Sequence, residues 1–195
     1  MSVVFVGSVS ISSATAEDLD RGEIVKRLSK PAGKTRSIKS AVKSGVSETD
    51  REFLDSVTKR GIKFNLAEKD KVAKIVSSPE FPKLDFEINF EFGSSAIRGD
   101  SKPQLIELSS ALSHASLTGT KVLLIGHTDA KGSLAFNDQL SEDRAQSVKD
   151  FLVAVGGINH SRLINFGYGE RRLKNKADPH AAENRRVEII NITVQ

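Results

Sequence analysis

The sequence of 195 residues contains no cysteine and no tryptophan, and Tyr168 is its single tyrosine. The absence of cysteine excludes disulfides, thiolate metal ligands, a cysteine nucleophile and a lipidated cysteine within this sequence. No segment approaches the roughly 20 consecutive apolar residues that a membrane-spanning helix needs. Because the hydrophobic fraction of 38% and the charged fraction of 28% lie in or near the globular range, the sequence predicts a folded, soluble chain.

The chain has a modest excess of positive charge. It carries 29 Lys and Arg against 25 Asp and Glu, for a net charge of +4. Such an excess favours an anionic partner, because it raises the partner's local concentration and association rate. Nucleic acid is not expected, since single-strand binders stack bases on aromatic side chains that are scarce here.

The first sixteen residues are mostly small or apolar and carry no charged side chain. They end in Ala14-Thr15-Ala16 before an acidic residue, a pattern typical of a secretory cleavage site. A basic stretch before the apolar one is missing. We interpret residues 1–16 as a signal-peptide remnant, and the β-prone residues 3–6 leave a short strand open as the alternative.

Residues 17–80 form a basic segment in which we expect short helices. The apolar spacing predicts helices over residues 18–28 and 66–76, and another that begins near Ser47 and stops at Gly61. The basic run of residues 30–43 is a solvated linker or an electrostatic patch for an anionic surface. This segment is also where an outer-membrane or other envelope protein could dock.

Residues 84–195 predict an α+β fold, an α/β sandwich in the order β-α-β-α-β-β. Residues 84–91 alternate between apolar and polar, as a strand with one buried face does. A helix follows near Pro103, and the apolar run KVLLIG, which ends at Gly126, predicts a central strand. After a polar loop over residues 127–138, Leu140 and Ser141 open the longest helix. The last strands are expected at residues 163–166 and 187–194, which together give a mixed sheet packed against helices.

The polar loop gathers residue types that suit a zwitterion. Thr128, Asp129 and Asn137 lie in the loop, and Arg144 is expected in the first turn of the helix that follows. An Arg can grip a carboxylate with two donors, and an Asp can accept from an ammonium group. The alternative is that Asp129 and Arg144 pair with each other and only fix the loop.

The same stretch resembles a known family. The run G-H-T-D-x-x-G-x-x-x-x-N-x-x-L-S-x-x-R-A, with GYGE at residues 167–170 and NRRVEI at residues 184–189, is similar to the signature of the OmpA C-terminal and MotB family. The resemblance implies non-covalent binding of peptidoglycan through the diaminopimelate of its stem peptide. It also implies a periplasmic or outer-membrane-associated place in the Gram-negative envelope.

The resemblance assigns roles to particular residues. Asp129 would hold the amine of diaminopimelate and Arg144 a carboxylate, while Arg186 would be structural and Ser141 a helix cap. Gly93 stands where the family commonly has Asp. The expected ligand-binding residues are Asp129, Arg144, Asn137, Thr128, Arg185, Gly93 and Ser94.

We expect no enzyme, no metal and no cofactor. The four histidines are scattered without metal-ligand spacing, and neither a G-x-S-x-G nor an H-E-x-x-H motif is present. An alternative function is an interaction module of the same fold that binds a protein or another anionic envelope partner. The sequence leaves open whether the protein is a homodimer.

Overall fold

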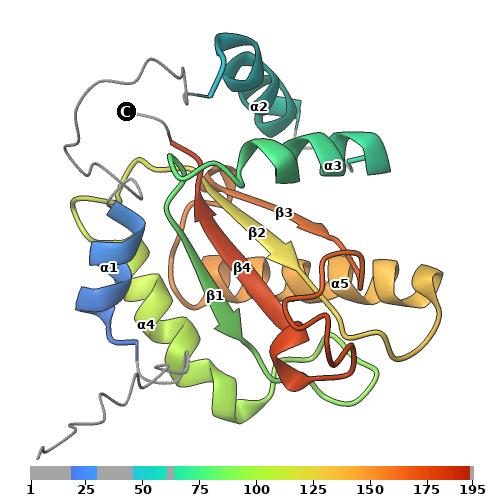
Figure 1. Ribbon diagram of the computed structural model, residues 1–195. Helices are drawn as coiled ribbons and strands as arrows, with labels where there is room; N and C mark the ends of the chain where they lie inside the picture. Colours follow the sequence, from blue (N-terminus) through green and yellow to red (C-terminus); the bar gives the residue numbers. More distant parts are fainter. Residues whose placement is uncertain (1–18, 30–45, 61–63, 194–195) are drawn as a thin grey trace, which may run out of the picture.

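The computed structural model describes residues 19–29, 46–60 and 64–193 (Figure 1). The predicted signal remnant at residues 1–16 and the basic run at residues 30–43 lie outside the described residues. Among the helices of the described ranges, none has both the length and the apolar character needed to cross a bilayer.

A four-stranded mixed sheet forms the centre of the fold. Its strands are β1 (Lys83–Glu87), β2 (Val122–Gly126), β3 (Leu163–Gly167) and β4 (Arg186–Asn191), in the spatial order β1-β4-β2-β3. β2 and β3 are parallel, whereas β4 runs antiparallel to both of its neighbours. The parallel pair needs a crossover, which is supplied by the long helix α5 (Leu134–Ala154). The predicted α+β class, with a mixed sheet packed against helices, is confirmed.

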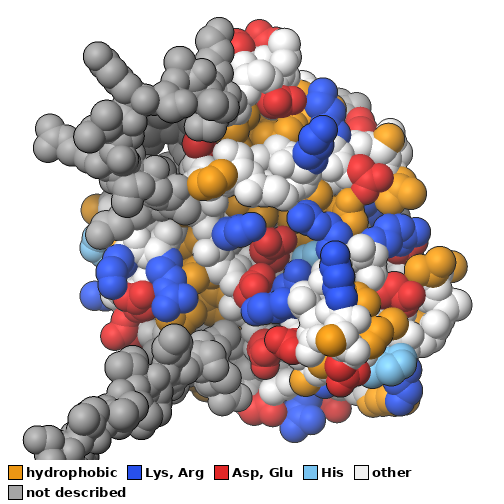
Figure 2. Space-filling view, in the orientation of Figure 1, with side chains coloured by type: hydrophobic (Ala, Val, Ile, Leu, Met, Phe, Trp, Pro, Cys, Tyr) orange, Lys and Arg blue, Asp and Glu red, His pale blue; other side chains and the backbone are white. Residues whose placement is uncertain are grey.

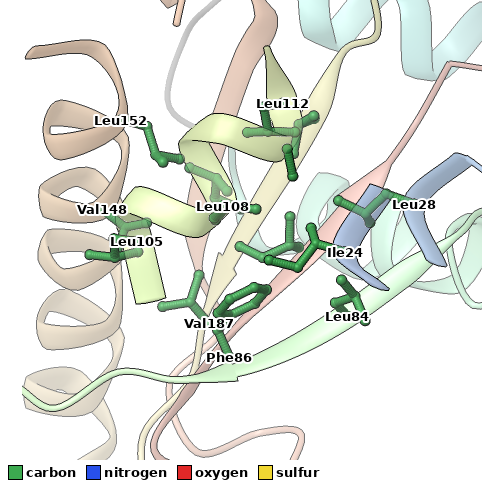
Figure 3. Close-up of a cluster of buried hydrophobic side chains, with 14 of the residues drawn as sticks. Ile24, Leu28, Leu84, Phe86, Leu105, Leu108, Leu112, Val148, Leu152 and Val187 are labelled. Carbon is green, nitrogen blue, oxygen red and sulfur yellow. The ribbon is translucent and has the colours of Figure 1, made fainter. Parts of the chain in front are cut away.

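One face of the sheet is covered by three helices. These are α1 (Arg21–Ser29), α4 (Lys102–Leu112) and α5, and their apolar side chains meet those of the strands in one core (Figure 3). Every residue of β2 is buried, as expected for a continuous apolar run. The labelled core side chains are Ile24, Leu28, Leu84, Phe86, Leu105, Leu108, Leu112, Val148, Leu152 and Val187.

The other face carries a second core under α2 (Glu48–Arg60) and α3 (Leu66–Ile75). Leu54 and Val72 of these helices pack with Ile125 and Ile190 of the sheet. Three short 3-10 turns, Gly99–Ser101, His160–Arg162 and Ala182–Asn184, complete the regular structure of the described residues.

The three helices predicted before residue 80 are present. Ser47 accepts a hydrogen bond from the Asp50 amide at 3.1 Å, as a residue that begins a helix does, and Asn65 forms a capping box with Glu68. These helices have no core of their own and bury their apolar faces on the sheet. The division of the chain into residues 1–16, a basic segment at residues 17–80 and a domain at residues 84–195 stays a prediction.

The start of the longest helix was predicted wrongly. α5 begins at Leu134, where the Ser133 hydroxyl caps it by accepting from the Phe136 amide at 3.2 Å, and not at Leu140. Ser141 is therefore no cap. It lies buried inside the helix, where its hydroxyl donates to the Asp138 carbonyl and accepts from the Gly169 amide. Arg144 consequently lies in the middle of α5 and not in its first turn.

The first strand is also shorter than predicted. β1 ends at Glu87, and the following residues turn back on themselves through an isolated bridge between Phe90 and Ile97. Gly93 has a φ of 62° in this turn, a conformation that favours glycine. The alternation of apolar residues continued past the end of the strand because Phe90 packs against the core without belonging to the sheet.

We expect Ile24→Ala to lower the free energy of unfolding by about 2 to 5 kcal/mol, because Ile24 is fully buried on the inner face of α1. Urea unfolding followed by circular dichroism measures the change. Ile106→Ala is the matched control, since Ile106 is 47% exposed and its truncation should cost less than about 0.5 kcal/mol. Equal, small effects of both changes would show that α1 does not belong to the folded core.

Candidate functional site

The candidate site lies at the end of β2, next to the middle of α5. Asp129 follows β2, Arg144 comes from the middle of α5, and Arg185 directly precedes β4. A hairpin loop over residues 90–97 reaches the site from the end of β1. Elements that are far apart in the sequence therefore supply its charged groups.

Arg144 is the most buried charged group of the site, with 8% of its surface exposed. Its Nε donates to the Ser94 carbonyl at 3.1 Å, and its guanidinium carbon lies 4.8 Å from the centre of the Phe90 ring. Among the described residues, no carboxylate lies within ion-pair distance of it. Burial lowers the pKa of Arg144, while the charge of Asp129 raises it and that of Arg185 lowers it. The guanidinium stays charged, because an arginine is not deprotonated in proteins.

Asp129 pairs with Arg185 and not with Arg144. One of its carboxylate oxygens accepts from Arg185 Nη1 at 2.8 Å, and the other accepts from the Lys131 amide at 3.2 Å. The side chain of Asp129 is 13% exposed and that of Arg185 is 44% exposed. The direct Asp129–Arg144 pair, considered as an alternative from the sequence, is not formed. The site thus holds two guanidinium groups and one carboxylate.

Asn137 and Thr128 are both buried beside these charges. The Asn137 amide nitrogen donates to the Asp129 carbonyl at 3.2 Å and to the Glu170 carboxylate, so it holds the loop in place. The Thr128 hydroxyl is buried and has no hydrogen-bond partner among the described residues. Thr128 thus keeps a buried polar atom without a partner in the described ranges, whereas the Asn137 amide nitrogen is committed to the loop.

The structure adds residues that the sequence did not single out for the site. Phe90 packs under Arg144 and Lys131 contributes its amide to Asp129. Phe92, at the tip of the hairpin loop, lies outside these contacts; it is 93% exposed, and the Lys131 ammonium lies 5.7 Å from its ring centre. In the sequence, the position of Phe92 directly before the turn residues Gly93 and Ser94 could have indicated that an aromatic ring borders the site. Gly93 shapes this turn, and Ser94 contributes its carbonyl to Arg144.

Next to the site, charged side chains gather over the middle of the sheet (Figure 2). Arg186 is buried and its Nε donates to Asp85 at 3.3 Å, which agrees with a structural part for this residue. His127 is also buried, with Nε2 at 3.6 Å from the Glu188 carboxylate. Burial lowers the pKa of His127, and the adjacent Glu188 offsets only part of this effect. Within the described ranges, no three His, Cys, Asp or Glu side chains are grouped so that they could hold a metal ion.

Comparison with known proteins identifies the family. The OmpA family model matches residues 89–186, half of the chain, and this match includes Asp129, Arg144 and Arg185. The chain belongs to the OmpA family. The family predicted from the sequence is thereby confirmed.

Curated members of the OmpA family share the matching region. Outer membrane porin F of Pseudomonas aeruginosa is 35% identical over 111 residues, which are 56% of this chain and 31% of that protein. Outer membrane protein A of Serratia marcescens is 32% identical over 118 residues, covering 56% of this chain and 32% of that protein. The match thus spans about a third of each relative's length. These relatives point to the cell envelope, as the sequence predicted.

Solved structures of the family were also found. The OmpA-like domain of FopA1 from Francisella tularensis aligns with a TM-score of 0.49 and 20% identity, over 56% of this chain and 71% of that one. The peptidoglycan-associated lipoprotein from Burkholderia pseudomallei aligns with a TM-score of 0.45 and 22% identity, over 53% of this chain and 86% of that one.

We expect the protein to lose stability as the pH falls from about 7 to about 5, because of His127. The unfolded chain takes up a proton near the usual histidine pKa of about 6.5, whereas burial keeps the pKa in the folded protein lower. The folded state therefore binds fewer protons in this window. Its free energy of unfolding should fall by up to about 1.4 kcal/mol per pH unit. Urea unfolding at a series of pH values measures this slope.

His127→Gln should flatten the slope, since the side chain no longer titrates. His160→Gln is the control, because it makes the same substitution at an exposed position. A wild-type stability that does not change between about pH 7 and about pH 5 would contradict a buried neutral His127.

Proposed function

We propose that this chain binds peptidoglycan without cleaving it, through the diaminopimelate of the stem peptide. The OmpA-like domain family generally binds peptidoglycan, and its members are structural or binding proteins and not enzymes. The residues that would make the contact are Asp129 and Arg144, with Arg185 at the edge of the site.

The state of Arg144 is the observation that carries this proposal. Its guanidinium is nearly buried, is oriented by the Ser94 carbonyl and Phe90, and has no carboxylate partner in the described part of the chain. A buried charge without a partner costs free energy, and a carboxylate that reaches it recovers part of this cost. The arrangement therefore favours an anionic group as ligand.

The charges of the site also match those of the ligand. Arg144 and Arg185 bring two positive groups and Asp129 one negative group. Diaminopimelate at the free end of a stem peptide presents two carboxylates and one ammonium. In the proposed complex, the guanidinium groups hold the carboxylates and Asp129 accepts from the ammonium.

The other predicted residues support this contact in different ways. The Thr128 hydroxyl offers a hydrogen bond to the ligand, since it is uncommitted. Asn137 acts indirectly, through its bonds to the Asp129 backbone and to Glu170. Gly93 and Ser94 form the wall that orients Arg144.

We expect Arg144→Gln and Asp129→Asn each to weaken binding to diaminopimelate-type peptidoglycan by at least about thirtyfold. The reason is that each change leaves a charge of the ligand unpaired in a largely buried site. Co-sedimentation of the purified protein with insoluble cell wall, over a range of protein concentrations, measures the affinity.

Arg27→Gln is the matched control, because it removes the same charge from an exposed position on α1. Circular dichroism and thermal unfolding establish that each variant is folded. The proposal fails if the wild-type protein stays in the supernatant, or if a folded Arg144→Gln variant sediments as the wild type does.

We also expect the site to discriminate between stem peptides. A lysine-containing stem lacks the side-chain carboxylate of diaminopimelate, so one guanidinium would be left without its partner. A site built for a charged hydrogen-bonding group rejects a ligand that lacks it, here by at least about tenfold. Isothermal titration calorimetry with soluble tripeptides of both kinds measures the ratio, and equal affinities would show that the side-chain carboxylate is not read.

A further inference from the structure

The hairpin loop over residues 90–97 has a well-held backbone. The Glu91 amide donates to the Ala96 carbonyl at 2.9 Å and the Arg98 amide donates to the Asn89 carbonyl at 2.9 Å. Its far side is fixed by the bond from Arg144 to the Ser94 carbonyl. The tip of the loop therefore has a defined position next to the site.

Phe92 occupies this tip with 93% of its surface exposed. This is the largest exposure among the exposed large hydrophobic residues of the described ranges, of which the next is Val155 with 60%. A ring in this position contributes almost nothing to folding, because exposed apolar surface gives no burial free energy. We therefore expect the role of the Phe92 ring to be a contact with a molecule outside the chain.

Lys131 links Phe92 to the site. Its amide donates to the Asp129 carboxylate at 3.2 Å, while its ammonium lies 5.7 Å from the Phe92 ring centre. In the described part of the chain, this ammonium has no carboxylate within ion-pair distance. Leu134 and Phe136, at the start of α5 a few residues further on, are also about half exposed. Of the six exposed large hydrophobic residues in the described ranges, half thus belong to the two segments that border the site.

We propose that Phe92 and Lys131 form a second subsite, which takes the sugar at the root of the stem peptide. This inference rests on the proposed function. The face of a pyranose ring carries C–H groups of slight positive charge, which pack well on the negative face of an aromatic ring. The Lys131 ammonium takes a carboxylate of the peptide between the sugar and the diaminopimelate.

One ligand is long enough to reach both subsites. Phe90 contacts Arg144, and Phe92 is two residues further along the loop, so their backbones are at most about 7 Å apart. In peptidoglycan, the diaminopimelate is separated from the sugar by two amino acids and a lactyl group, and the second amino acid is linked through its side chain, so this spacer reaches further than the roughly 7 Å of two ordinary extended residues. A sugar could therefore reach Phe92 while the diaminopimelate occupies the site at Arg144.

The test compares two soluble ligands by isothermal titration calorimetry: the diaminopimelate tripeptide alone, and the same tripeptide attached to N-acetylmuramic acid. We expect the wild-type protein to bind the sugar-bearing ligand more tightly. Phe92→Ala should weaken that ligand by about three- to tenfold, the range usual for an aromatic contact, and leave the tripeptide unchanged. Phe92→Tyr should retain the wild-type affinity for both ligands.

Val155→Ala is the control, since it removes exposed apolar surface at the opposite end of α5. The inference is overturned if the wild type and Phe92→Ala bind the sugar-bearing ligand equally, or if Phe92→Ala loses affinity for both ligands alike. It is also overturned if Phe92→Ala changes only self-association or binding to lipid vesicles. The proposed function itself fails in a different way, namely if the wild-type protein binds neither soluble ligand.

Discussion

The backbone of α5 packs in direct contact with the backbone at the ends of β2 and β3. This contact determines where Asp129 and Arg144 lie. A Cβ atom on Gly126 would lie 2.2 Å from the Ser141 carbonyl oxygen, and one on Gly167 would lie 2.2 Å from the Glu142 amide nitrogen. Only glycine allows such an approach. The Ser141 hydroxyl and the Glu142 carboxylate then bond to the amides of Gly169 and Gly167, which fixes the helix along the strands.

The same contact connects the two faces of the sheet. Glu142 also accepts from the Lys69 ammonium of α3 at 2.7 Å, so one carboxylate joins α5, the end of β3 and a helix from the other layer. Three residues before Ser141, Asp138 bonds to Arg171 in the loop that follows β3. The middle of α5 is thus held from several directions, and Arg144 lies in this stretch of the helix.

How far the sequence predicts the structure depends on how local each signal is. The apolar run of β2 and the alternation at β1 are local patterns, and from them both segments were correctly predicted to be strands. Asp129 and Arg144 were expected together because one lies in a polar loop and the other in the helix that follows it, and the family pattern then favoured a ligand over a direct pair. The pairing of Asp129 with Arg185 was missed, because it depends on the path of the loop after β3, where turns and side-chain bonds replace periodicity. The start of α5 was missed because residues 133–139 are mostly polar, and only the Ser133 cap marks their helix.

The contacts of Arg144 with the Ser94 carbonyl and the Phe90 ring affect how fast a released ligand is bound again. A guanidinium that is already immobilised loses little conformational entropy when a ligand arrives, so most of the ordering cost falls on the ligand. Peptidoglycan repeats the same stem along a polymer, and a neighbouring stem is present at a high effective concentration when one is released. In the proposed complex, a protein that releases one stem would often bind a neighbouring stem before it diffuses away, because the site needs no reordering.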